Sequence, residues 1–212
     1  MSAAITSLTG GSMRSAYMVF ILAIAALALP LTAQDNPAPI ASSPYVAFEK
    51  GDGILSLTLG AKLPLAIYDP NEKAFESSTN MKPGFAFALS YVHFLNDDWA
   101  FGGDLAGTFI GTLAERRLFM APLSLRFVRA FNLDPFIIAP TAGLGMTIAS
   151  LGEDKHIDPL LKFGSSFYWR ATGDISYGLN ILFDIIPQLY TDSDQNRTGF
   201  FMDATLSVAY HL

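Results

Sequence analysis

The sequence contains no cysteine, few charged residues and, after residue 33, no run apolar enough for a membrane-spanning helix. Without cysteine the chain has no disulfide, no lipid-modified cysteine and no thiolate metal site. Charged residues make up 15% of the chain, compared with ~25% in a typical soluble domain. The formal net charge of −6, without a basic patch, disfavours nucleic acid as a partner. Hydrophobic residues still reach 51%, and high average hydrophobicity without long runs is typical of a membrane β-barrel.

Residues 1–33 have the three parts of a secretory signal peptide. Arg14 precedes an uncharged run at residues 16–33, and that run ends in small residues at Ala33. A basic residue, an apolar core and a small-residue exit precede signal cleavage, so Ala33 is the expected last residue removed. A helical membrane anchor is the other interpretation, because ~20 apolar residues span a bilayer. Pro30 and the small-residue exit favour the cleaved signal.

The rest of the chain has a length that suits one domain with a short lead-in. Residues 34–50 begin with Gln-Asp-Asn-Pro-Ala-Pro and are expected to form a flexible lead-in. Residues 51–212 are the expected transmembrane β-barrel. Met13 gives a tighter start to the signal than Met1, and translation from Met13 is kept as an alternative.

A two-residue alternation of apolar with small or polar side chains repeats eight times between Ile54 and Leu212. Side chains of a strand point alternately to opposite faces, so each repeat predicts a strand with one apolar and one polar face. The clearest stretch is residues 55–67, in which alternate positions hold only Leu, Ala and Ile. The eight predicted strands are residues 54–68, 83–95, 99–113, 118–130, 135–149, 160–172, 175–189 and 198–212.

The apolar faces of these predicted strands carry no Asp, Glu, Lys or Arg. A Lys or Arg that faces lipid near the bilayer midplane costs ~2–4 kcal/mol, so an uncharged face predicts contact with lipid. A soluble barrel with an apolar interior shows the same alternation, but its outer face carries long charged side chains. Here the second face is mostly Gly, Ala, Ser, Thr and Asn, which suits a narrow lumen. The sequence therefore predicts an all-β protein: an eight-stranded antiparallel transmembrane β-barrel preceded by a signal peptide.

Charges of both signs lie on the predicted lumen face. Because buried charges must be paired, opposed signs in a narrow lumen are first a structural requirement, and a gating or selectivity role is the functional alternative. The members of this predicted lumen network, a candidate gate, are Lys62, Asp104, Arg126, Lys162, Arg170, Asp184 and Asp203.

Connections between the predicted strands alternate between short turns and loops that are mostly longer. The short turns, which contain Asn, Asp or Gly, are residues 96–98, 131–134 and 173–174. The loops are residues 69–82, 114–117, 150–159 and 190–197. Short inner turns and longer outer loops are the polarity of outer-membrane barrels. Binding residues concentrate on surface loops, with plain solvated caps as the alternative. The candidate extracellular loop residues are Asp69, Glu72, Lys73, Glu76, Glu153, Asp154, Lys155 and His156.

Four prolines lie inside the predicted strands. Proline removes a ladder donor, and a closed barrel has no edge where the gap is harmless, so bulges or frayed ends are expected there. These prolines are Pro64, Pro122, Pro140 and Pro187.

The last strand resembles the C-terminal assembly signal of bacterial outer-membrane proteins. That signal has apolar residues at alternate positions, an aromatic residue third from the end and usually a terminal Phe. The matching residues are Leu206, Val208, Tyr210 and Leu212, with Leu212 in place of the terminal Phe. The resemblance implies recognition by the barrel-assembly machinery, contact with outer-membrane lipid, and a location in the outer membrane of a Gram-negative-type envelope.

Residues 134–136 (Asp-Pro-Phe) and 142–145 (Ala-Gly-Leu-Gly) are similar to motifs of small barrels of the OmpW and OmpX type. The OmpW-like resemblance, which we prefer, implies a narrow or gated channel for small hydrophobic molecules. The neighbouring OmpX and OmpA types imply a non-conducting structural or adhesive surface protein, whose loops bind host or envelope ligands.

The sequence shows no recognisable catalytic set. Its three histidines are His93, His156 and His211. For none of them does the sequence place both a nucleophile and an acidic residue that would orient the histidine nearby. We therefore expect no enzymatic activity, no catalytic residue, no cofactor and no metal site.

Overall fold

The structure, a computed structural model, describes residues 48–212 except 114, 134, 153 and 191–192. The predicted signal peptide and the lead-in up to residue 47 lie outside the described residues. Among the described residues, no helix is long and apolar enough to cross a membrane. The described residues form one antiparallel sheet and a short 3-10 helix, η1 (Ser193–Gln195), so the chain is all-β.

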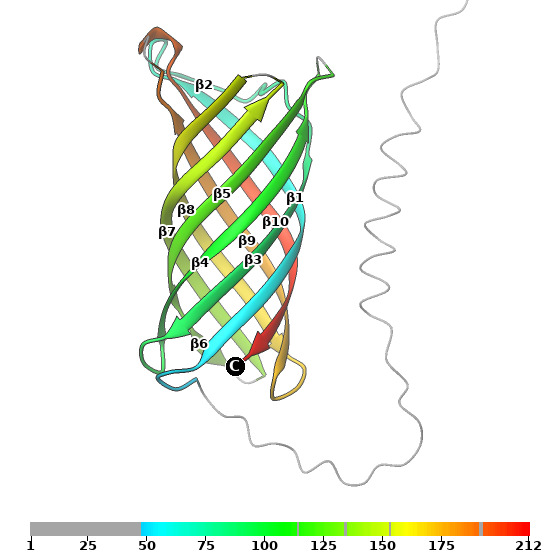
Figure 1. Cartoon of the computed structure of the whole chain (residues 1–212), viewed down its shortest axis with the longest axis vertical. Coiled ribbons are helices and arrows are strands. Elements are labelled where there is room, and N and C mark those ends of the chain that lie inside the picture. Colours follow the sequence, from blue (N-terminus) through cyan, green and yellow to red (C-terminus); the bar gives the residue numbers. More distant parts are fainter. Residues whose placement is uncertain (1–47, 114, 134, 153, 191–192) are drawn as a thin grey trace, which may run out of the picture. The chain divides into compact units, whose positions relative to one another are not determined.

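Eight long strands form a closed antiparallel barrel, in which each strand pairs with its neighbours in chain order (Figure 1). The wall strands are β1 (Gly53–Asp69), β3 (Gly84–Phe94), β4 (Trp99–Gly111), β5 (Arg117–Arg129), β7 (Phe136–Leu151), β8 (Asp154–Arg170), β9 (Ile175–Gln188) and β10 (Arg197–His211). Two short strands pair with the ends of wall strands: β2 (Ala74–Glu76) with the end of β1, and β6 (Phe131–Leu133) with the start of β7. The predicted eight-stranded barrel is confirmed.

The last strand closes the barrel by pairing with the first. β10 pairs with β1 over almost its whole length, and the amide of Leu212 donates to the carbonyl of Gly53 at 2.8 Å. The outward residues Leu206, Val208 and Tyr210 alternate on β10 with buried Thr205, Ser207 and Ala209. A barrel closed in this way leaves no unpaired sheet edge along its wall.

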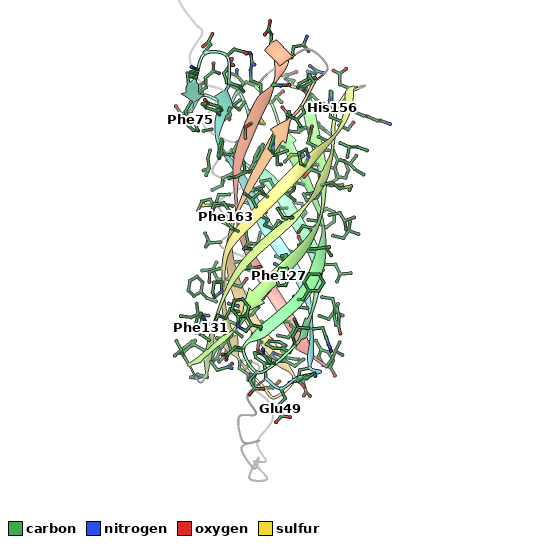
Figure 2. All side chains as sticks on the ribbon, turned by 90° about the vertical axis from the view of Figure 1, so that its left-hand side faces the viewer. Glu49, Phe75, Phe127, Phe131, His156 and Phe163 are labelled. Carbon is green, nitrogen blue, oxygen red and sulfur yellow. The ribbon has the colours of Figure 1, made fainter. Side chains whose placement is uncertain are left out.

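The apolar face of the wall points outward. Leu57 and Leu125 are 55% and 60% exposed, whereas their neighbours Ser56 and Ser124 are buried. Figure 2 shows side chains such as Phe163 on the outer surface of the wall. A continuous exposed belt of Leu, Ile, Phe and Val is unfavourable in water but is the surface that a transmembrane barrel presents to lipid. The predicted outward direction of the apolar face is therefore confirmed.

The two ends of the barrel are distinguishable by their connections. The end that carries the short turns after β3 and β8, together with the start of β1 and the end of β10, is called the turn end below; Glu49 and Phe131 lie there (Figure 2). The opposite end carries β2 and η1, is called the loop end, and is marked by Phe75 and His156 (Figures 1 and 2).

One predicted loop is mostly strand. β7 and β8 continue to pair as far as Leu151 and Asp154, so Asp154, Lys155 and His156 lie on β8 and not in a loop as predicted. Glu153 lies outside the described residues. Gly152, with φ of +70°, supplies the left-handed backbone that lets the two strands turn within a few residues. The polar composition of residues 150–159 therefore marks a hairpin, which sequence reasoning mistook for a flexible connection.

The prolines lie where the hydrogen-bond ladders are interrupted. Pro64 is at the register shift between β1 and β10, and the pairing of β4 with β5 skips the positions opposite Pro122. Pro140 lies in the gap between the pairings that β7 makes with β5 and with β6. The missing donors therefore fall at bulges or breaks, as predicted.

Candidate functional site

Six of the seven predicted lumen charges form one layer across the barrel interior. Three cations face three carboxylates, and the layer draws on six of the eight wall strands. We call this layer the charge belt; its members are Lys62, Asp104, Arg126, Lys162, Asp184 and Asp203.

Lys62 is the centre of one half of the charge belt. Its Nζ lies 2.5 Å from Asp184 Oδ2 and 2.8 Å from Asp203 Oδ1. Lys62 and Asp203 are direct cross-strand partners on β1 and β10, a placement that favours opposite charges. The Lys62 side chain is almost completely buried, so its charge is balanced by the two aspartates and not by water.

Asp104 is the centre of the other half. Its Oδ2 lies 2.7 Å from Lys162 Nζ, and its Oδ1 lies 3.3 Å from Arg126 Nε. The hydroxyl of Ser124, its cross-strand partner, also donates to Oδ1. Lys162 Nζ is 4.0 Å from Asp184 Oδ1, which joins the two halves. One continuous series of ion pairs therefore crosses the lumen.

A glycine on β7 makes room for the belt. Gly143 lies in register between Arg126 on β5 and Lys162 on β8. A Cβ at Gly143 would lie 2.5 Å from the carbonyl oxygen of Leu125 and 3.0 Å from Cγ of Arg126. Both distances are too short, so a side chain here would displace either the strand or the arginine.

Apolar side chains fill the lumen between the charge belt and the turn end. The largest members of this turn-end plug are Phe48, Ile54, Val92, Phe94, Val128 and Ile137, and small alanines such as Ala209 complete it. Phe48 stacks on Phe94 with ring centroids 4.2 Å apart and on His211 at 5.4 Å. The cavity that remains has a volume of about 30 Å³, room for about two water molecules.

Arg170 belongs to this plug and not to the charge belt. It is the last residue of β8, and its guanidinium carbon lies 4.9 Å from the centroid of the Phe48 ring. A cation over an aromatic face is a favourable contact. Alternation correctly placed Arg170 on the inner face, but its position along the strand puts it at a different height, so its predicted membership of the network is corrected here.

The turn-end plug also contains a contact that sequence reasoning missed. Ser176 Oγ and His211 Nε2 are 2.8 Å apart, in a hydrogen bond that joins β9 to β10. Ser176 is 1% exposed and Phe48 covers the His211 ring, so both groups are packed inside the plug. The sequence contained a signal for this contact, because the alternation places both residues on the inner face at the same end of two adjacent strands.

The loop end of the lumen is open by contrast. A cavity of about 860 Å³, which we call the loop-end cup, lies between the charge belt and the loops. Its floor includes Met120, Ile186 and Phe201, and Phe201 lies directly against the belt, with Lys62 Nζ 5.8 Å from its ring centroid. The wall above carries His156 and Tyr190, whose rings pack edge to face at 4.7 Å.

Two prolines end the wall pairing beside the loop-end cup. The β8–β9 ladder stops at Leu161 and Ile185. Continuing that register would bring Pro159 opposite Pro187, and neither has an amide hydrogen to donate. Beyond this point β8 pairs with β7 and β9 pairs with β10, and the β8–β9 ladder does not continue among the described residues. The β8–β9 hydrogen bonds thus end where Pro187 would face a second proline, Pro159, on the neighbouring strand.

The predicted loop residues lie in different environments. Asp69 is buried at the end of β1, where its Oδ2 lies 2.9 Å from Arg197 Nη2. Contrary to the prediction, Asp69 is thus part of a structural ion pair. Glu72 and Lys73 are exposed in the turn before β2, and Glu76 is exposed on β2. This turn and β2 present the predicted acidic and basic side chains as a protruding loop would.

The predicted site residues at the start of β8 differ in exposure. Asp154 is exposed and pairs with Arg116 at 3.4 Å, and Lys155 is exposed beside it. Asp154, at the rim, lines the cup together with His156 and Asp158. Asp158 was not among the residues predicted for this loop, and the alternation of inward and outward positions was not extended to residues 150–159. Among the described residues, no cluster of His, Cys, Asp or Glu could hold a metal ion.

A closed eight-stranded wall with an apolar outside and a charged, filled interior defines the class: this chain is a small β-barrel of the outer-membrane type. A protein-family model matches residues 34–210, well over half of the chain, and the chain belongs to that family. A curated relative from Treponema pallidum (strain Nichols), described as an uncharacterized protein, is 21% identical over 175 residues, which cover 79% of this chain and 80% of the relative.

Solved structures of small outer-membrane barrels are similar in fold. Neisserial surface protein A matches with a TM-score of 0.57 and 12% identity, over 76% of this chain and 97% of that protein. The outer membrane protein OprG from Pseudomonas aeruginosa matches with a TM-score of 0.44 and 12% identity, over 77% of this chain and 97% of that protein. The predicted resemblance to small outer-membrane barrels is confirmed, and the OmpW-like assignment within them stays a prediction.

Proposed function

We propose that this protein is an outer-membrane surface protein with a closed lumen, and that its binding function resides at the loop end. The observation that carries the proposal is the charge belt. Its six side chains, five of them buried, cross the lumen as one series of ion pairs, and the turn-end plug fills the space below it. An eight-stranded barrel has an interior that side chains can fill completely. The proposal assigns the barrel no catalytic role.

The sequence supports a route to the outer membrane. Residues 1–33 have the pattern of a cleaved signal, and the family match begins at residue 34, directly after Ala33. The outward residues of the last strand would be read by the barrel-assembly machinery, and the apolar wall would then lie in outer-membrane lipid with the loop end outside. Neisserial surface protein A, similar in fold, is by its name a surface protein.

Planar lipid bilayers test the closed lumen. The reconstituted barrel should add no stable conducting state to the bilayer, because moving ions through the charge belt would require breaking buried ion pairs. A solvent-filled barrel of more strands is the positive control for insertion and recording. A stable, large open state of this protein would contradict the proposal.

The exposed turn around Glu72 and Lys73, with Glu76 on β2, is the proposed contact for host or envelope ligands. Cells that display the protein should lose binding to such ligands when residues 70–76 are replaced by a Gly-Ser segment of equal length. A matched replacement of the turn at residues 95–98, at the opposite end, is the control. Equal binding by both replacements and the wild type would remove this part of the proposal.

A gated channel for small hydrophobic molecules is the second candidate, and one observation favours it. The loop-end cup has an apolar floor of Met120, Ile186 and Phe201, where such a molecule could rest. A gated channel would have to open the charge belt below this floor. Brief openings that become more frequent in a Lys62→Met variant would support this candidate over a permanently closed barrel.

A further inference from the structure

The loop-end cup has the size and composition of a small-molecule site. Its volume of about 860 Å³ lies within the ~300–1,000 Å³ that ligand pockets occupy. Met120, Ile186 and Phe201 give it an apolar floor, and most of its polar lining residues lie on β8, on β9 or at Tyr190 and Gln195. An apolar surface with a few convergent polar groups is the usual composition of a ligand site.

The wall of the cup holds a buried carboxylate that forms no ion pair with a described Lys or Arg. Asp158, on the inner face of β8, is 2% exposed, and its Oδ2 has no hydrogen-bond partner among the described residues. Gln188 and His156 are the polar side chains that interact with this carboxylate. Burying a carboxylate without a cation is unfavourable. The free cup is therefore electrostatically incomplete at Asp158.

The lining of the cup is acidic and aromatic. Asp154 and Asp158 line it, and within the described part of the chain no Lys or Arg does. Asp154 is exposed at the rim and pairs with Arg116, whereas Asp158, in the wall, forms no ion pair with another described residue. The Tyr190 ring lies against His156, two residues before Asp158, and aromatic faces attract cations.

We infer that the loop-end cup binds a small organic ammonium ion with a compact apolar body. The ammonium group donates to the Asp158 carboxylate, and the apolar body rests on Met120 and Phe201. The χ2 torsion of aspartate is broad, so either carboxylate oxygen can turn toward the ligand. An anion with the same body is repelled. The inference goes beyond the proposed function, because it depends on the cup and not on a closed lumen or on ligand binding by loops.

Three probes with one apolar body and different heads test the inference: 1-aminoadamantane, 1-adamantanol and adamantane-1-carboxylate. The barrel is placed in nanodiscs of zwitterionic lipid and titrated by calorimetry, with protein-free nanodiscs to measure partitioning into lipid. The amine should bind saturably and about tenfold tighter than the alcohol, since a hydrogen bond to a charged group is stronger than one between neutral groups. The carboxylate should show no saturable binding.

Matched variants assign the binding to Asp158. Asp158→Asn keeps the size of the side chain and removes its charge, so it should weaken amine binding about tenfold and leave the alcohol unchanged. Asp154→Asn, the control, removes an exposed carboxylate and should change amine binding by less than about twofold. Gln188→Lys supplies a cation beside Asp158 and should abolish saturable amine binding. Heat-dependent migration in SDS gels shows that each variant is a folded barrel.

Equal amine affinity for the wild type and Asp158→Asn would overturn the inference, as would equal affinity for all three heads. Amine uptake no greater than that of protein-free nanodiscs would overturn it as well. A barrel that conducts in planar bilayers and still binds the amine through Asp158 would contradict the proposed closed lumen and support the ammonium site. The two proposals therefore fail separately.

Discussion

The two ends of the barrel share one wall and yet hold very different interiors. At the turn end, apolar side chains and the inserted Phe48 leave a cavity of about 30 Å³, whereas the loop end encloses about 860 Å³. The charge belt separates them. Because eight strands fix the width of the barrel, the difference comes from what fills its interior. Inward-facing apolar side chains and Phe48, which precedes the first strand, fill the turn end, whereas β8 and β9 stop pairing near Pro159 and Pro187 at the loop end.

This contrast shows which part of the lumen provides stability and which part is available for binding. A close-packed region resists both removal and addition of volume, whereas a region beside an open cavity tolerates change. We expect substitutions to separate the two ends by their effect on the free energy of unfolding. Urea unfolding in lipid vesicles, followed by the fluorescence of Trp99 and Trp169, measures that quantity.

Breaking the charge belt should have the largest effect. Lys62→Met leaves Asp184 and Asp203 buried without their shared cation, so the free energy of unfolding should fall by about 3–5 kcal/mol. The double variant Lys62→Met with Asp203→Asn, which restores charge balance, should recover a large part of that loss. A single variant as stable as the wild type would mean that water reaches these carboxylates and that the belt does not separate the two ends.

Removing the inserted ring should have the next largest effect. Phe48→Ala removes a buried aromatic side chain that stacks on Phe94 and His211, and should lower the free energy of unfolding by about 3 kcal/mol. Phe75→Ala, at the loop end, removes an exposed ring that contacts Tyr68 and Phe200 and should cost only about 0.5–1.5 kcal/mol. Similar losses for the two variants would show that Phe48 does not close the turn end.

A matched pair of enlargements tests packing at the two ends directly. Ala209→Leu forces extra volume into the turn-end plug, where Ala209 is 1% exposed, and should cost about 1–3 kcal/mol. Ala149 faces the loop-end cup, so Ala149→Leu should enter open space and cost less than about 1 kcal/mol. The reverse order of the two losses would contradict the assignment of the cup as the open end.

The strands and the charge belt could be predicted from the sequence because alternation has a simple geometric meaning. Once Leu57 is assigned to the outer face, Lys62, five positions later on the same strand, must face inward. The alternation on their own strands likewise places Asp104 and Lys162 on the inner face. Which charges meet depends on the register between strands, and no local pattern encodes it. Arg170 shows this limit, since it has the right parity but a different height along the barrel.

The cup and the plug were not predicted, for two physical reasons. Phe48 precedes the first alternating stretch, so nothing in the period of two connects it with the lumen. Residues 150–159 are polar because they form a hairpin at the end of the barrel, and polarity alone does not separate a hairpin from a loop. The inward position of Asp158 follows from the β7–β8 pairing and not from the composition of residues 150–159.

The smallest effect is expected for the ion pair at the rim of the cup. Arg116 and Asp154 lie 3.4 Å apart, but both side chains are more than half exposed. Water and salt screen such a pair, so Asp154→Asn should change the free energy of unfolding by less than about 1 kcal/mol, in contrast to the buried belt. Raising the salt concentration should reduce even this loss of unfolding free energy in Asp154→Asn. The loss of unfolding free energy in Lys62→Met should not change with salt. A large, salt-insensitive loss in Asp154→Asn would mean that the rim of the cup is as closely packed as the turn end, and the contrast between the two ends would no longer hold.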